Sequence, residues 1–309
     1  MTAEALLARD VRKTYTSRRG PTVEALAGVS LVVHPGERVA LLGRNGAGKT
    51  TFLKIASTLL RPTGGSVEVF GHNAGENPDE VRPMIAVVPQ EGKPFFHLTP
   101  REQVYTYLRA RGYDGPEAKS RTKDALGQMG LDEVADRLSI TLSGGQRQRT
   151  MVATVIATEA PLLFLDEPTI GMDPFARRAV WDSLRTLTRR GSTILLTTHY
   201  LDEAEALSQR LYIIERGRVL VDGTAASLKE EVGGSLRVSI AGGERLAEAA
   251  RTFGSVLNDG DTLHVITTPE RLPELMGLAV REHLTATVGP VTLEEAFLRV
   301  VGRSIDTEE

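Results

Sequence analysis

Short, uninterrupted apolar runs recur along the N-terminal part of the 309-residue chain, and stretches of mixed polarity separate them. Such runs are typical of strands buried on both faces of a sheet. The runs lie at residues 38–42, 85–89, 162–165 and 193–197. Residues 49–60 and 175–190 follow two of these runs and carry the spacing of amphipathic helices. Buried strands that alternate with helices predict an α/β fold with a mixed sheet core.

Further strands with a less uniformly apolar pattern are expected at residues 5–15, 24–33, 66–70, 210–215 and 219–221. The first two are joined by a polar turn at 16–22, which favours antiparallel pairing at the edge of a sheet. The last two predict a hairpin that closes this part of the chain.

Residues 91–141 show no strand pattern after their first few positions and predict a helical insertion in the α/β chain. Thr99, Pro100 and Glu102 combine a helix N-cap, a proline at the first helical position and the acidic residue of a capping box. They predict a helix that ends near residue 111, and a second helix is expected near 116–130.

The pattern changes again after a Gly-Gly linker at 233–234. Beyond it we expect strands at 236–240 and 286–288, a hairpin about 258–260, and helices at 245–253, 269–284 and 293–301. The chain therefore predicts two domains, residues 1–232 and a small α+β domain at 233–309 for which a ferredoxin-like arrangement is a candidate. The second domain offers no Gly-rich loop, so we expect a regulatory or dimerisation role for it.

Composition narrows the classes of function. Hydrophobic residues make up 41% of the chain and charged residues 25%, as in globular proteins. The 37 basic and 40 acidic residues give a net charge of −3, so we expect no nucleic-acid partner bound by general electrostatic attraction. There is no cysteine, which excludes disulfides and thiol chemistry. The N-terminal residues do not predict a signal peptide. No apolar run approaches the roughly 20 residues needed to cross a bilayer, so a membrane process would need a separate membrane subunit.

One stretch carries a specific phosphate-binding pattern, GxxxxGK[ST], between an expected strand and an expected helix. Its residues are Gly43, Arg44, Asn45, Gly46, Ala47, Gly48, Lys49 and Thr50. The glycines let the backbone N–H groups turn towards phosphates, and the helix N-terminus favours negative charge. Lys49 is expected to reach the β- and γ-phosphates and Thr50 to ligate Mg²⁺.

Polar residues follow three of the buried strands, where α/β sheets bind ligands. Asp166 and Glu167 are adjacent and point to opposite sides, which predicts a magnesium ligand and a group that activates water. Gln90 could hold Mg²⁺ and water through its amide, although a surface glutamine is the common case. His199 could donate to a phosphate, although a lone histidine at a strand end is more often a plain polar residue.

Two further features are open when taken alone. Ser143, Gly144, Gly145 and Gln146 precede a helix and could form a second anion-binding terminus, or only a capped helix after a flexible turn. Tyr15 could stack on a purine base, or pack on an apolar core at the end of its strand.

Five features follow one another along the chain: the phosphate loop, Gln90, the Leu-Ser-Gly-Gly-Gln sequence, the run ending in Asp166-Glu167, and the Thr-Thr-His at residues 197–199. With these features in this order, the chain resembles the nucleotide-binding subunit of an ATP-binding-cassette (ABC) transporter. The resemblance covers about residues 4–228. Leu-Ser-Gly-Gly-Gln is its most specific element, because many nucleotide-hydrolysing families share the phosphate loop. The resemblance implies ATP and Mg²⁺ as cofactors and an ATPase with the P-loop NTPase fold.

The resemblance also assigns roles residue by residue. Tyr15 matches the aromatic that stacks on adenine, and Gly43 to Thr51 match the Walker A loop. Gln90 matches the Q-loop, Ser143 to Gln146 the signature, and Asp166 the magnesium carboxylate. The catalytic base corresponds to Glu167, the D-loop to Asp173 and the switch histidine to His199. Met172 stands where leucine commonly precedes the D-loop aspartate.

In this family two copies pair head to tail around two ATP molecules, so that each Walker A faces the other copy's signature. The resemblance therefore implies a homodimer on the cytoplasmic face of the membrane, bound to an integral membrane permease. Residues 291–303 resemble the C-terminal appendage of daunorubicin-resistance and related multidrug export ATPases, which implies export of a drug or other hydrophobic compound. A non-transport ABC ATPase acting on ribosomes or DNA is the alternative, whereas a GTPase-like switch would lack its guanine-reading motif.

Phe95 and Phe96 form an aromatic pair between Gln90 and the helical insertion. If exposed, the pair could receive a helix of the membrane partner. Alternatively, both rings fill the interface between the sheet and the insertion.

Overall fold

The computed structural model describes residues 4–16, 21–231 and 234–306. Its contacts divide the chain into two compact units, Met1–Asp222 and Gly223–Glu309, which are described separately below. This division places the helix after residue 224 in the second unit, whereas the sequence pattern grouped it with the first. Most of the expected turn at 16–22 and Gly233 of the expected linker lie outside the described residues.

The centre of the first unit is a six-stranded sheet in the order β10-β9-β3-β8-β7-β6. Its strands are β3 (Arg38–Leu42), β6 (Ile85–Val88), β7 (Leu162–Asp166), β8 (Thr193–Thr198), β9 (Arg210–Glu215) and β10 (Arg218–Gly223). The pairs from β9 to β6 are all parallel, as the apolar runs predicted. The β9–β10 hairpin turns through Arg216 and Gly217, whose positive φ angles of 47° and 73° suit a tight two-residue turn.

A four-stranded antiparallel sheet in the order β2-β1-β4-β5 packs beside it. Its strands are β1 (Leu6–Tyr15), β2 (Val23–Val33), β4 (Gly64–Val69) and β5 (His72–Asn73). The predicted antiparallel pairing of the first two is confirmed, with Leu6 opposite Val33. Strand β5 was not predicted, because two polar residues carry no strand pattern.

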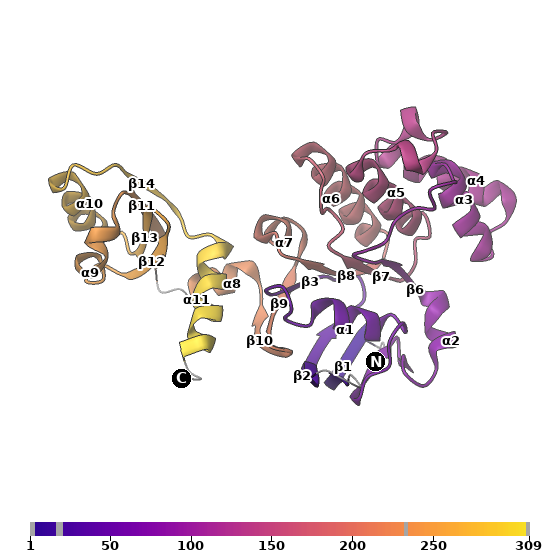
Figure 1. Ribbon diagram of the computed structural model, residues 1–309, viewed down its shortest axis with the longest axis horizontal. Coiled ribbons are helices and arrows are strands. Elements are labelled where there is room, and N and C mark those ends of the chain that lie inside the picture. The colour runs from indigo at the N-terminus through magenta and orange to yellow at the C-terminus, as the bar shows by residue number, and fades with distance from the viewer. Residues whose placement is uncertain (1–3, 17–20, 232–233, 307–309) are drawn as a thin grey trace. The chain divides into compact units, whose positions relative to one another are not determined.

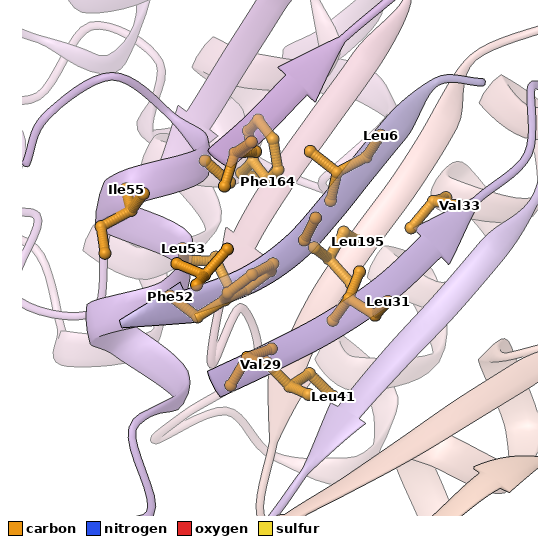
Figure 2. Close-up of a cluster of buried hydrophobic side chains, with 14 of the residues drawn as sticks. Leu6, Val29, Leu31, Val33, Leu41, Phe52, Leu53, Ile55, Phe164 and Leu195 are labelled. Carbon is orange, nitrogen blue, oxygen red and sulfur yellow. The ribbon is translucent and has the colours of Figure 1, made fainter. Parts of the chain in front are cut away.

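The main core lies between the two sheets and helix α1 (Lys49–Ala56), as Figure 2 shows. Figure 2 shows side chains from both sheets and the helix in one cluster: Leu6, Val29, Leu31, Val33, Leu41, Phe52, Leu53, Ile55, Phe164 and Leu195. Helix α1 is shorter than the predicted 49–60, since Thr58 takes a positive φ of 63° and ends it. The N–H groups of Leu59 and Leu60 then bond back to the Lys54 carbonyl.

The helical insertion is present as two helices that pack on each other and on α5 (Figure 1). The helices of this unit after α1 are α2 (Pro78–Val81), α3 (Pro100–Ala110), α4 (Gly115–Gln128), α5 (Gly144–Ile156), α6 (Pro174–Arg189) and α7 (Leu201–Leu207), with 3-10 turns η1 (Arg82–Met84), η2 (Asp132–Val134) and η3 (Ser139–Thr141). The predicted capping box of α3 is confirmed, since Thr99 and Glu102 exchange both bonds.

The second unit begins with α8 (Ala225–Glu230) and contains a fully antiparallel sheet in the order β12-β13-β11-β14. Its other elements are β11 (Leu236–Ala241), η4 (Glu244–Leu246), α9 (Ala247–Ala250), β12 (Ser255–Asp259), β13 (Thr262–Thr267), α10 (Leu272–Arg281), β14 (Ala286–Pro290) and α11 (Leu293–Asp306). This β-α-β-β-α-β order is that of a ferredoxin-like fold. Helices α9 and α10 are shorter than the ranges predicted for them.

Candidate active site

Parallel pairing brings the functional segments to one edge of the central sheet. Leu42, the last residue of β3, lies opposite Thr198 of β8, and Asp166 of β7 lies opposite Thr197. The phosphate loop, Asp166-Glu167 and Thr198-His199 therefore all leave the sheet at the carboxyl ends of neighbouring strands, where α/β sheets bind ligands.

The phosphate loop requires glycine at two positions for steric reasons. Gly48 has φ 110°, and a Cβ there would lie 2.6 Å from the Ala25 carbonyl oxygen. A Cβ at Gly43 would lie 2.3 Å from the Ile214 carbonyl oxygen. Both contacts are with backbone that is fixed in a strand, so side chains at these positions would displace the loop.

A cleft of about 300 Å³ opens at this loop. It is lined by Ala25, Asn45, Gly46, Gly48, Lys49, Thr50, Thr51, Gln90 and Glu167. The structure thus brings together most of the predicted nucleotide-binding residues with Gln90 and Glu167. Its rim is formed by backbone N–H groups at a helix N-terminus, which suits an anion.

Lys49 lies at the base of the loop and is 6% exposed. Its Nζ donates to the carbonyl oxygens of Gly43 at 2.7 Å and Arg44 at 3.1 Å. Burial lowers the pKa of Lys49, while the carboxylates of Glu167 and Asp166 act in the opposite direction. The ammonium group is therefore held inside the loop by carbonyls, near two negative charges.

Three oxygen-bearing side chains meet beside Lys49. Thr50 Oγ1 lies 3.3 Å from Gln90 Oε1 and 3.2 Å from Asp166 Oδ1. The Thr197 hydroxyl donates to the same Asp166 oxygen at 2.5 Å and fixes the orientation of the carboxylate. Hydroxyl, amide and carboxylate oxygens are hard ligands of the kind that Mg²⁺ takes.

Glu167 is nearly buried and held at an unusual backbone conformation, with φ 52°. Its N–H donates to the carbonyl oxygen and hydroxyl of Thr197, at 3.1 and 3.2 Å. The carboxylate Oε2 lies 3.2 Å from His199 Nδ1. Strained positions of this kind cluster at active sites because the surrounding structure enforces them.

The His199 ring is held in a stack. Its centroid lies 4.1 Å from that of Tyr200, and the Arg177 guanidinium lies 4.2 Å from the Tyr200 ring centroid. Half-exposed His199 therefore keeps a defined orientation towards Glu167.

The signature residues do not line this cleft. Ser143 is the N-cap of α5 and exchanges two hydrogen bonds with Gln146, so the capped-helix interpretation is confirmed as local structure. Ser143 and Gly144 are nevertheless exposed, with their N–H groups at the start of a 13-residue helix. A Cβ at Gly145 would lie 3.4 Å from the Gly171 carbonyl, so the signature packs against the segment that precedes Asp173.

The other predicted residues that do not line the cleft are Tyr15, Gly43, Arg44, Ala47, Asp166, Asp173 and His199. The Asp173 carboxylate caps α6, and hydrogen bonds from the N–H groups of Ala176 and Phe175 lower its pKa. Tyr15 is 42% exposed at the end of β1, so the interpretation that it packs on the core is wrong.

Phe95 and Phe96 are 61% and 49% exposed. The interpretation that both rings fill an internal interface is therefore wrong as well. An exposed aromatic pair is uncommon on a surface that contacts only water.

Sequence reasoning missed two contributors to the site. Thr197 orients both Asp166 and Glu167, and its position directly before Thr198-His199 was the available signal. Ala25 lines the cleft from β2, and no sequence signal pointed to it because only the sheet packing places it there.

The fold and the site define a nucleotide-hydrolysing cassette, and comparisons with known proteins assign the family. The family described as "ABC transporter" matches residues 26–170. The chain is 38% identical to the daunorubicin/doxorubicin resistance ATP-binding protein DrrA of Streptomyces peucetius, over 96% of this chain and 93% of that protein. It is 37% identical to the Nod factor export ATP-binding protein I of Burkholderia thailandensis, over 90% and 92% of the two chains.

Solved structures agree with this assignment. An ATP-binding subunit of an ABC transporter matches with a TM-score of 0.66 and 30% identity, over 74% of this chain and 93% of the other. A dimeric ATP-binding cassette in a post-hydrolysis state, bound to ADP and Pi, matches with a TM-score of 0.66 and 28% identity, over 71% and 98%.

The chain belongs to the ABC transporter family, and the fold class predicted from its sequence is confirmed. Within that family it is an ATP-binding, ATP-hydrolysing subunit of the drug-resistance and export group. In the described part of the chain, none of the helices has the length and apolar character needed to cross a bilayer.

Proposed function

We propose that this protein hydrolyses MgATP at sites shared by two copies of the chain, and that hydrolysis drives export through a separate membrane permease. One observation carries the proposal: Lys49, Thr50, Gln90, Asp166 and Glu167 converge at the phosphate loop, while the exposed start of the signature helix does not line that cleft. A second copy, placed head to tail, would bring that signature to the nucleotide.

The chemistry follows from the charge of the transferred phosphoryl group. Phosphoryl transfer needs positioning and charge neutralisation more than covalent chemistry. Lys49 and His199 would contact the γ-phosphate from one copy, and Ser143 and Gly145 from the other. Glu167 would orient and polarise the attacking water as the general base. Tyr15 would stack on adenine, and Asp173 would contact the other copy through the D-loop.

Magnesium is the cofactor that suits the oxygen cluster beside Lys49. Thr50, Gln90 and Asp166 would hold it, since Mg²⁺ is usually bound through one or two carboxylates and other oxygens, with phosphate and water completing the shell. No group of three or more His, Asp or Glu side chains suited to a metal occurs among the described residues, which agrees with a metal bound largely through its nucleotide. When bound, the ion supplies charge neutralisation for the β- and γ-oxygens.

The partner and location follow from the relatives. Their names refer to drug resistance and export, which supports an exporter whose cargo is a drug or another hydrophobic compound. The protein would then act at the cytoplasmic face of the membrane, bound to the permease. Phe95 and Phe96 would receive a helix of that permease, because they are exposed close to Gln90 in the chain. Residues 233–309 would form the regulatory or dimerisation domain.

ATPase and co-purification assays test the two halves of this proposal. The purified protein is expected to release phosphate from ATP with Mg²⁺ and to stop when EDTA is added. Expressed in its native host, it is expected to co-purify with an integral membrane protein. Magnesium-independent or absent turnover would contradict the ATPase half, and recovery with ribosomes or DNA would contradict the export half.

A further inference from the structure

A fully buried carboxylate lies directly behind the catalytic loops. Glu203 is in the first turn of α7 and is 0% exposed. Its Oε1 accepts hydrogen bonds from the Thr169 hydroxyl at 2.8 Å and from Trp181 Nε1 at 3.2 Å. The other oxygen, Oε2, is buried and has no well-aligned partner among the described residues. A buried carboxylate is costly, so its retention calls for an explanation beyond packing.

Glu203 connects the two loops that carry catalytic groups. Its partner Thr169 follows Glu167 by two residues in the loop after β7, and it is 0% exposed. Glu203 itself lies in the first turn of α7, four residues after His199. Glu203 therefore joins the segment of the proposed general base to the segment of the switch histidine.

A second connection joins the same two loops, because the Glu167 N–H donates to Thr197. Thr197 and Glu203 thus hold the loops at two points, while Trp181 anchors Glu203 to helix α6. Two loops fixed at two points cannot rotate against each other without breaking a buried hydrogen bond, which is unfavourable.

We propose that Glu203 is a positioning residue of the ATPase reaction, a buried bridge that keeps Glu167 and His199 in the relative placement that hydrolysis requires. The inference rests on the proposed function, and Glu203 acts through Thr169 and through its own helix α7 without lining the nucleotide cleft. Displacement of a catalytic group by about 1 Å can cost 10²-fold in rate, so a hydrogen-bonded bridge of this kind matters for turnover.

The bridge consists of hydrogen bonds from Thr169 and Trp181 to Oε1 of Glu203. Burial raises the pKa of Glu203. Glutamine is a close substitute, because its Oε1 accepts as before and its amide has the shape of the carboxyl group. Leucine has a similar size but leaves Thr169 and Trp181 without this partner.

The test compares Glu203→Gln and Glu203→Leu by steady-state ATPase kinetics at saturating Mg²⁺. Glu203→Gln is expected to keep the wild-type kcat. Glu203→Leu is expected to lose kcat by about 10²-fold while KM for ATP stays near wild type, because the phosphate loop is unchanged. Fluorescence of Trp181, the one tryptophan of the chain, is expected to change in Glu203→Leu but not in Glu203→Gln.

A second variant keeps the test decisive if Glu203→Leu does not fold. Thr169→Val removes the 2.8 Å bond at constant volume and is expected to lower kcat with KM unchanged. Its matched control is Thr122→Val, because Thr122 is 2% exposed and bonds to the Ala118 carbonyl in α4, away from the site. Wild-type kcat in a folded Glu203→Leu or in Thr169→Val would overturn the bridge, as would a Glu203→Gln variant as slow as Glu203→Leu.

These outcomes are separable from the proposed function. An unmodified protein that does not hydrolyse MgATP would contradict the function itself. An active unmodified protein whose Glu203 and Thr169 variants are equally active would contradict only the bridge.

Discussion

Replacement of one carboxylate oxygen by an amide nitrogen, in Glu167→Gln, tests the proposed general base with little change of shape. The carboxylate is 6% exposed, 3.2 Å from His199, and held by the backbone bonds to Thr197. Those bonds involve only the N–H of residue 167, so they survive the substitution. We therefore expect the variant to fold with an unfolding temperature near that of the wild type.

The expected loss is in turnover. A positioned general base contributes about 10²–10⁴-fold, which is about 3–5 kcal/mol of activation free energy. Binding of ATP depends on the phosphate loop, Lys49 and Thr50, and these groups are unchanged. The variant should thus bind ATP and accumulate as an ATP-bound dimer, because the step that dissolves the dimer is blocked.

The assay is phosphate release at saturating MgATP, combined with size-exclusion chromatography and the amount of nucleotide retained. Glu117→Gln is the matched control, because Glu117 pairs with Arg121 on the helical insertion, away from the cleft. The control should retain wild-type turnover. Turnover of Glu167→Gln within a few-fold of wild type, or loss of ATP binding with no dimer, would refute the assignment of the base.

Three other substitutions test separate parts of the account. Phe96→Ala should leave ATPase activity and melting temperature unchanged but abolish co-purification with the permease, whereas a large drop in melting temperature would contradict docking. In Glu203→Gln, stability relative to wild type should rise as pH increases above about 4.5. Burial raises the pKa of Glu203 in the folded protein, so the wild type loses stability once the unfolded chain ionises this carboxyl while the folded chain still holds the proton. Chemical unfolding at pH 5 and 8 measures the difference, and a constant difference would contradict the prediction. Arg237→Met should destabilise residues 234–306 by about 2 kcal/mol at pH 7, because it leaves the buried Glu295 carboxylate without its 2.8 Å partner. Burial raises the pKa of Glu295, but hydrogen bonds from Thr292 and Arg237 outweigh this, so its pKa in the folded protein is lowered. The destabilisation should therefore shrink as pH falls below about 4.5. Amide hydrogen exchange at pH 4 and 7 measures it, and an equal destabilisation at both pH values would contradict the prediction.

The sequence predicts the order of elements well where the apolar runs are continuous. The strands that end at Leu42, Asp166 and Thr198 are buried on both faces, so their composition alone identifies them. Element ends were less predictable. Helix α1 stops at Ala56 because Thr58 adopts a left-handed conformation, which a threonine rarely does and which no local pattern announces.

The sequence predicted which residues belong to the candidate site, but not how their side chains are arranged. Spacing identified Lys49 and Asp166, whereas the hydroxyl of Thr197 that orients Asp166 depends on the register of two parallel strands. Glu203 looked like an ordinary acidic residue of an amphipathic helix. Its burial follows from how α6 and α7 pack, which is a tertiary property.

The central claim is that each active site combines the phosphate loop of one copy with the signature of the other. Mixing two inactive variants tests it most directly: Lys49→Ala removes the phosphate-binding lysine, and Ser143→Arg blocks the signature. In a 1:1 mixture, half the dimers would be mixed, and each of these would hold one intact site, so about a quarter of the wild-type ATPase rate should return. A mixture no more active than its separate components would contradict the shared site, as would full activity of Ser143→Arg alone.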